Sequence, residues 1–276
     1  MTPPPQAGHP HREVHDPLMT STPHEIARAT WAEIHDTEYH LAVLPWGATE
    51  AHNYHLPYAT DVYESEAIAA EAARIAWEQG VHSAVLPCVP FGVNTGQLDI
   101  KLTINMNPTT QFAVLRDVVE SLARQGIRKL VVLNGHGGND FRQFLRELGA
   151  KYPVLLVQLN WFQVFPQKDY FTHTGNHADE METSLMMHVQ PELVRPLEEA
   201  GSGSQNKFRI PALREGWAWT ERHWPSATND TGVGYPREAT KEKGERFFND
   251  LTRKIAGFLV DLGRADTAAL YEKPRE

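Results

Sequence analysis

The chain has 276 residues, a formal net charge of −9 and an isoelectric point near 5.9. This acidity argues against nucleic acid or an anionic membrane surface as a partner, because both select clustered Lys and Arg. The longest apolar runs are strand-sized, well short of the roughly 20 residues that a membrane span needs. The single cysteine, Cys88, excludes an intrachain disulfide and favours the reducing cytoplasm.

Short apolar runs alternate with amphipathic stretches, a pattern typical of βαβ units and a mostly parallel α/β sheet. Residues 1–21 are rich in Pro and His and lack the apolar segment of a signal peptide, so we expect a disordered lead-in there. Helices are predicted at residues 22–34, 62–79, 109–125, 139–150, 178–189 and 237–262. Strands are predicted at residues 40–46, 82–87, 129–133 and 154–159. One domain over residues 22–263 and a mobile tail over 264–276 are expected, with a long irregular and functional segment at 201–236.

Ligand-type side chains follow two of the predicted strands. Glu50, His52 and Asp61 come after the first strand, and His136 follows the strand that ends at Leu133. Because the carboxyl ends of parallel strands meet at one edge of the sheet, these side chains are expected to converge there. Carboxylates and imidazoles suit a hard or borderline divalent ion, and a shared acid can bridge two such ions about 3.5–4 Å apart.

Each of these residues also has a simpler explanation. Glu50 and His52 could form a solvated loop pair, Asp61 could cap the following helix, and His136 could be incidental in a glycine-rich turn. The occurrence of all of them at one sheet edge favours the metal site.

Glu182 belongs to the helix predicted at residues 178–189. Its neighbours on that helix, Leu185, Met186 and Val189, form an apolar stripe, so its carboxylate is expected to face the interior. A buried carboxylate is costly unless it is paired or bound to a metal, although it could also orient a neighbouring group. Glu180 falls on another face and remains ambiguous. His177 is a candidate general acid or a capping residue.

Together these stretches resemble the creatininase (creatinine amidohydrolase) family. The resemblance spans about residues 22–262 and includes a weaker match around Gly234-Tyr235-Pro236. The main matching motifs are Leu44-Pro45-Trp46-Gly47-Ala48-Thr49-Glu50-Ala51-His52, His55-Leu56-Pro57 with Asp61, Asn134-Gly135-His136-Gly137-Gly138-Asn139, and His177-Ala178 with Glu182-Thr183-Ser184.

The resemblance implies a three-layer α/β/α sandwich, a homo-oligomer that is often a hexamer, and two Zn, Mn or Fe ions per subunit. It assigns Glu50 and His136 to one metal, His52 to the other, Asp61 to both, and the catalytic histidine to His177. Creatininase itself has a glutamate where this chain has Gly138, and we propose Glu182 as the missing ligand. The segment 94–103 also lacks the His and the Pro-Gly-Thr of many relatives, so creatinine is an unlikely substrate.

The expected function is that of a cytoplasmic dinuclear hydrolase in which metal-bound hydroxide cleaves a non-peptide C–N bond of a small cyclic or formyl-type amide. His177 would protonate the departing nitrogen. Candidate substrate-binding residues are Gly137, Gly138, Trp161, Trp217 and Trp219, with Trp224 beside them. These tryptophans could equally pack loops onto the body. The alternatives are a metallopeptidase acting on a small modified peptide and a non-catalytic oligomeric binding protein.

Overall fold

The computed structural model describes residues 23–272, so the predicted lead-in at 1–21, the predicted helix start at Thr22 and the last four residues lie outside the described range. A parallel sheet of four strands, in the order β2-β1-β3-β4, lies at the centre of the molecule. The strands are β1 (Leu41–Trp46), β2 (Ser83–Val85), β3 (Lys129–Asn134) and β4 (Leu155–Asn160). All four were predicted from the apolar runs.

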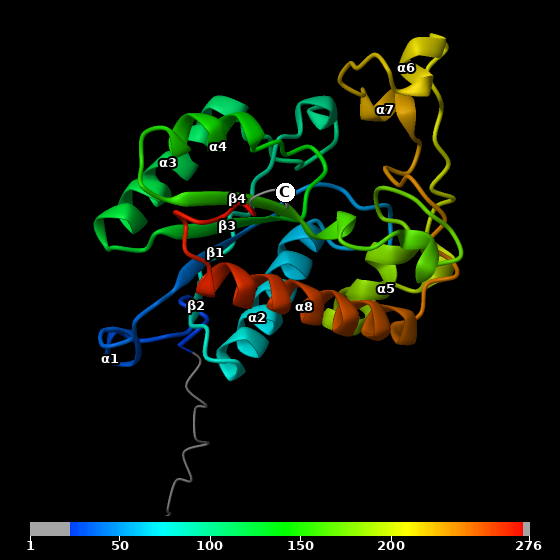
Figure 1. The fold of residues 1–276 in the computed structure, drawn as a ribbon. Helices are drawn as coiled ribbons and strands as arrows, with labels where there is room; N and C mark the ends of the chain where they lie inside the picture. The colour runs from blue at the N-terminus through cyan, green and yellow to red at the C-terminus, as the bar shows by residue number, and fades with distance from the viewer. Residues whose placement is uncertain (1–22, 273–276) are drawn as a thin grey trace, which may run out of the picture.

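Helices cover both faces of this sheet (Figure 1). On one face lie α2 (Thr60–Glu78), α5 (Glu180–Val189) and α8 (Lys241–Arg264), and on the other lie α3 (Pro108–Arg124) and α4 (Arg142–Gly149). Successive residues of β1 alternate between the two cores: Leu41 and Val43 pack towards α2 and α8, while Ala42 and Leu44 pack towards α3. The three-layer α/β/α arrangement is therefore confirmed.

Several helix starts differ from those predicted, including that of α8, which begins at Lys241 rather than Arg237. The first helix, α1 (Trp31–Ile34), is a single turn, because Ile26 donates its N–H to the carbonyl of Val85 at the edge of the sheet instead of joining a helix. Helix α4 begins at Arg142 rather than Asn139, whose side chain accepts from Val93 N and Gln111 Nε2 and donates to Asn134 Oδ1. Helix α2 begins at Thr60 with Ala59 as its N-cap, so Asp61 does not cap the helix.

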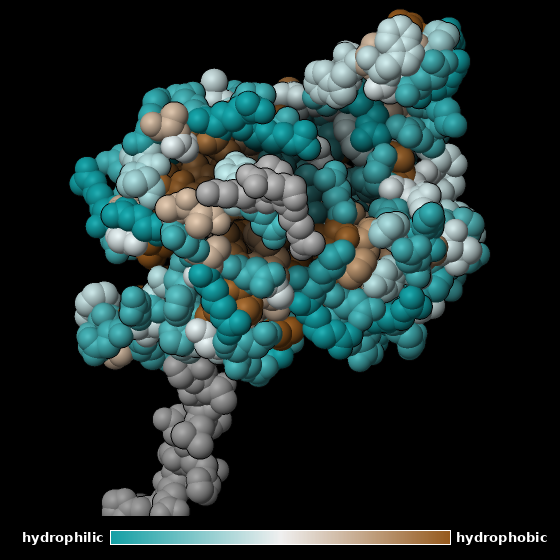
Figure 2. Space-filling model, in the orientation of Figure 1, coloured by the Kyte–Doolittle hydropathy of each residue, from teal (hydrophilic) through white to brown (hydrophobic). Residues whose placement is uncertain are grey.

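The irregular segment 201–236 forms an arm beside the body and contains two short helices, α6 (Pro211–Glu215) and α7 (Trp224–Ala227). The part with α6 and α7 stands out at the upper right of Figures 1 and 2, where its surface is mostly hydrophilic. None of the helices within residues 23–272 has the length and apolar character needed to cross a membrane.

Candidate metal centre

The loop after β1 passes directly over the start of α2. A Cβ added at Gly47 would lie 2.8 Å from the backbone of Asp61, so glycine permits this close crossing. The crossing brings Glu50 and His52 next to Asp61 in the first turn of α2. His136 arrives from the neighbouring strand β3, as the rule on strand carboxyl ends predicted.

The two oxygens of Asp61 face different histidines. Its Oδ1 lies 2.9 Å from His52 Nε2, and its Oδ2 lies 3.1 Å from His136 Nδ1. His136 Nδ1 is also 2.8 Å from Glu50 Oε1. All four side chains are buried. Asp61 thus stands between two groups of possible ligands, the arrangement that a bridging carboxylate requires.

The second nitrogen of each histidine is held by a backbone carbonyl. His136 Nε2 donates to Val93 O at 3.0 Å, and His52 Nδ1 donates to Glu50 O at 3.1 Å. Backbone carbonyls commonly fix metal-binding histidines in this way, leaving the other ring nitrogen for the ion. Here those other nitrogens are the ones that face the carboxylates.

The charges of this cluster are strongly coupled. Burial alone would lower the pKa of His52, but Asp61, together with Glu182 and Glu50, outweighs burial and raises that pKa to about 10. Burial likewise opposes ionisation of Asp61, and His52 and His136 together outweigh it and hold the pKa of Asp61 below its usual range. A divalent cation binding here would take over the role of the histidine protons, as expected of a metal site.

Glu182 enters the cluster from α5, behind His52. Its Oε2 lies 4.0 Å from His52 Nε2 and accepts the N–H of Ala178, which has a left-handed φ of 47°. Burial raises the pKa of Glu182 to about 8. Glu180, the ambiguous acid, points elsewhere and forms a 2.5 Å ion pair with Lys243. Of the two acids, Glu182 therefore lies beside His52, whereas Glu180, although also buried, pairs with Lys243.

Two of the possible ligand triads share Asp61, namely Glu50–Asp61–His136 and His52–Asp61–Glu182. Within each triad the candidate ligand atoms lie within 4.8 Å of one another. Three carboxylates and two imidazoles, without a thiolate, suit a pair of Zn-, Mn- or Fe-type divalent ions.

His177 lies directly beside these groups, with its ring centroid 4.1 Å from that of His52. Its Nε2 donates to Ala51 O at 2.8 Å, so Nδ1 faces Glu50 Oε1 at 3.8 Å. Burial, followed by the neighbouring His52, lowers the pKa of His177 to about 4. At neutral pH its Nδ1 therefore has a free lone pair and can accept a proton.

A cavity of about 1000 Å³ opens above the cluster, with Glu50, His136 and His177 in its inner wall. Both predicted glycines, Gly137 and Gly138, line it. The arm supplies the opposite wall, including Trp219 and Trp224.

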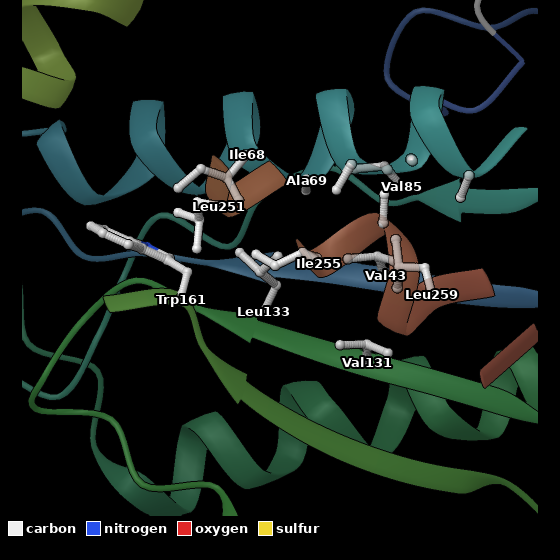
Figure 3. Packing of buried hydrophobic residues seen from close by; sticks show 14 of the residues in the cluster. Val43, Ile68, Ala69, Val85, Val131, Leu133, Trp161, Leu251, Ile255 and Leu259 are labelled. Carbon is white, nitrogen blue, oxygen red and sulfur yellow. The ribbon is translucent and has the colours of Figure 1, made fainter. Parts of the chain in front are cut away.

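Two of the tryptophan predictions need correction. Trp161 is fully buried in the core between the sheet and helices α2 and α8 (Figure 3). Its ring contacts those of Phe162 and Phe247, so it does not line the cavity. Trp217 is 76% exposed on the arm and also lies outside the cavity wall. The sequence places a tryptophan in a loop but does not show which way its ring turns.

Two residues of the site were missed. Gln97, from the segment 94–103, is buried and donates its side-chain N–H to Glu50 Oε2. Nothing in the sequence marked it. Glu64 is fully buried on α2, and neither of its oxygens has a hydrogen-bond partner in the described part of the chain. Its spacing of three residues from Asp61 and four from Ile68 could have identified it, by the same argument that found Glu182.

The α/β fold and the cluster of candidate metal ligands at its sheet edge point to a hydrolase. The creatininase family model, described as creatinine amidohydrolase, matches residues 27–259. The chain therefore belongs to the creatininase family and is a hydrolase of the amidohydrolase type.

Known relatives differ in their activities. The mycofactocin precursor peptide peptidase of Mycobacterium tuberculosis is 28% identical over 254 residues, covering 85% of this chain and 92% of the relative. A crystal structure from Bacteroides fragilis, provisionally assigned as a creatinine amidohydrolase, is 44% identical with a TM-score of 0.86, covering 91% of this chain and 100% of that one. A creatininase mutant structure of Zn-Zn type has a TM-score of 0.68 at 23% identity, covering 87% and 98% of the two chains, and so shows the shared fold.

Proposed function

We propose that this protein is a dinuclear metal-dependent amidohydrolase that cleaves a non-peptide C–N bond in a small cyclic or formyl-type amide. The main support is the position of Asp61, whose two oxygens face two separate histidines beside the cavity. Glu50, Asp61 and His136 would hold one ion, and His52, Asp61 and Glu182 the other.

When bound, the ions would activate a water molecule and polarise the amide carbonyl that it attacks. The protein's own residues would move the proton. His177 Nδ1 accepts a proton from the attacking water, because the ring is uncharged at neutral pH and Nε2 is already committed to Ala51 O. The same atom then delivers that proton to the departing nitrogen, which completes the role expected of His177.

A modified peptide is the second candidate substrate. The relative from Mycobacterium tuberculosis is named as a peptidase. A cavity of about 1000 Å³ lies at the upper end of the size range of small-molecule sites, which gives space for a larger substrate.

A panel of substrates would test both candidates. Protein loaded with Zn, Mn or Fe(II) would be incubated with cyclic amides, N-formyl amides and short peptides, and the products measured by mass spectrometry. The proposal predicts hydrolysis of a cyclic or formyl-type amide that disappears on chelation and returns with metal. Turnover that is insensitive to chelation would refute the metal-dependent mechanism, and cleavage of peptides alone would favour the peptidase. Sedimentation analysis of the same sample would test the expected homo-oligomer, for which the resemblance implies a hexamer.

A further inference from the structure

The cavity wall contributed by the arm is rich in positive charge. It includes Lys207, Arg209, Arg214 and Arg222, whereas the acids lining the cavity outside the metal cluster are Asp140 and Glu221. The chain as a whole has a net charge of −9. This local reversal of charge favours an anionic group on the molecule that enters the cavity.

Arg222 is the half-buried member of this set, and ring contacts through Trp224 join it to His177. Its guanidinium carbon lies 4.2 Å from the ring centroid of Trp224, and the same indole lies 4.8 Å from the ring of His177. Within residues 23–272, no side chain or carbonyl forms a hydrogen bond or ion pair with its guanidinium. Glu221 and Glu50 attract this guanidinium without bonding to it, so its N–H donors are left for a ligand.

Packing of the segment 95–97 against the arm fixes the position of Arg222 relative to the metal cluster. A Cβ on Gly96 would lie 2.0 Å from Arg222 O, so the arm packs directly on this glycine. Thr95 Oγ1 also donates to Glu221 Oε2 at 3.1 Å. The next residue in the same turn, Gln97, donates to Glu50. One short segment therefore contacts both the arm at Arg222 and the acid at the metal cluster.

We propose that Arg222 binds a carboxylate of the substrate, so that the natural substrate is an amide with a carboxylate a few bonds from the scissile C–N bond. A planar carboxylate matches the planar fork of a guanidinium, and the indole of Trp224 shields one face of that fork from water. Lys207 and Arg209 are exposed to solvent, so they would attract the anion rather than orient it. This inference rests on the proposed function, since it assumes that the amide reaches the metal cluster.

Binding of a matched pair of compounds would test it. 5-Oxoproline and 2-pyrrolidinone share a cyclic amide and differ by one carboxylate. Each would be titrated calorimetrically into metal-loaded wild-type protein and into Arg222→Met, Arg222→Lys and Arg253→Met variants. Arg253 is the control, because it pairs with Asp250 on α8 and does not line the cavity.

Wild-type protein and Arg253→Met should bind 5-oxoproline at least about 10-fold more tightly than 2-pyrrolidinone, the scale of a charged hydrogen bond. Arg222→Met should lose that preference, and Arg222→Lys should recover part of it. The absence of any preference in wild-type protein would overturn the inference. A preference that survives in Arg222→Met would overturn it too, because the carboxylate would then be bound elsewhere, for example by the ions.

The titration measures binding rather than turnover, so the carboxylate site and the proposed amidohydrolase activity can be refuted independently. A preference that depends on Arg222, in a protein that hydrolyses no amide, would refute the proposed function and leave the carboxylate site in place.

Discussion

Replacing Asp61 should remove both ions, whereas replacing Glu50 or Glu182 should remove one. Asp61 belongs to two candidate triads; of these two, Glu50 belongs only to the one with His136, and Glu182 only to the one with His52. The conservative variants Asp61→Asn, Glu50→Gln and Glu182→Gln keep the side-chain shapes and remove one negative charge each. They are therefore matched to one another.

The expected size of the effect follows from ligand loss. Losing a group outside the coordination sphere typically weakens metal binding about 10- to 100-fold, so losing a charged ligand should cost at least about 100-fold. At a free metal concentration ten times the wild-type Kd, each wild-type site would be about 90% occupied, and a site weakened 100-fold would be below about 10%. Asp61→Asn should then carry fewer than about 0.2 ions per chain, and each of the other variants about one.

Elemental analysis after equilibrium dialysis against Zn or Mn would give these numbers directly. Circular dichroism would verify that each variant is folded. Equal loss of metal from Asp61→Asn and Glu50→Gln would refute the bridging role of Asp61. Full retention of metal in Glu182→Gln would show that another residue completes the second site.

Four further substitutions test the roles of individual residues in and around the site. His177→Ala should lower kcat about 100- to 10,000-fold while leaving the metal content unchanged, as measured with the substrate found in the panel. Glu180→Ala should destabilise the fold by about 3 kcal/mol in urea denaturation without loss of metal, because it removes the buried partner of Lys243. Trp161→Ala should cost about 3–5 kcal/mol through a core cavity, whereas Trp219→Ala, at a side chain 84% exposed, should change stability by less than about 0.5 kcal/mol. A larger loss of stability in Trp219→Ala than in Trp161→Ala would contradict the placement of these two side chains in the structure.

The sequence predicted the elements that depend on local pattern. Strand β1 and helix α2 appear within about two residues of their predicted bounds, because a continuous apolar run and a 3.6-residue period are local signals. The helix predicted from residue 22 was wrong, since the backbone of Ile26 bonds to Val85, a partner distant in the chain. Strand order brought His136 to Glu50, and that step also followed from a general rule of parallel sheets.

Contacts that depend on how the loops pack could not be predicted from the sequence. Gln97 reaches Glu50 only because its segment packs under the arm, and no pattern in residues 94–103 encodes that packing. The direction of Trp161 is decided by its packing on Phe247 from α8, far along the chain. Residues whose position is fixed by one regular element were thus predictable, and residues positioned by two irregular segments were not.

Gly138 offers the sharpest test of how this chain departs from creatininase, which has a glutamate there. A Cβ at Gly138 would lie 2.2 Å from Val93 O and 2.5 Å from His136 Nε2, which are the two atoms of the hydrogen bond that orients His136. Even alanine must therefore displace the imidazole, although it removes no ligand. Gly137 is the matched control, because a Cβ there meets nothing within 4 Å.

Gly138→Ala should consequently lose the ion of the Glu50–Asp61–His136 triad, keep the other, and be destabilised by about 1–3 kcal/mol from overpacking. Gly137→Ala should retain both ions and wild-type stability, as measured by elemental analysis and urea denaturation. If Gly138→Ala kept both ions, the hydrogen bond from His136 to Val93 would not be what positions that ligand. If the expected loss is found, this backbone has no room for a glutamate at position 138, and the fifth ligand must come from another element, as Glu182 on α5 would provide.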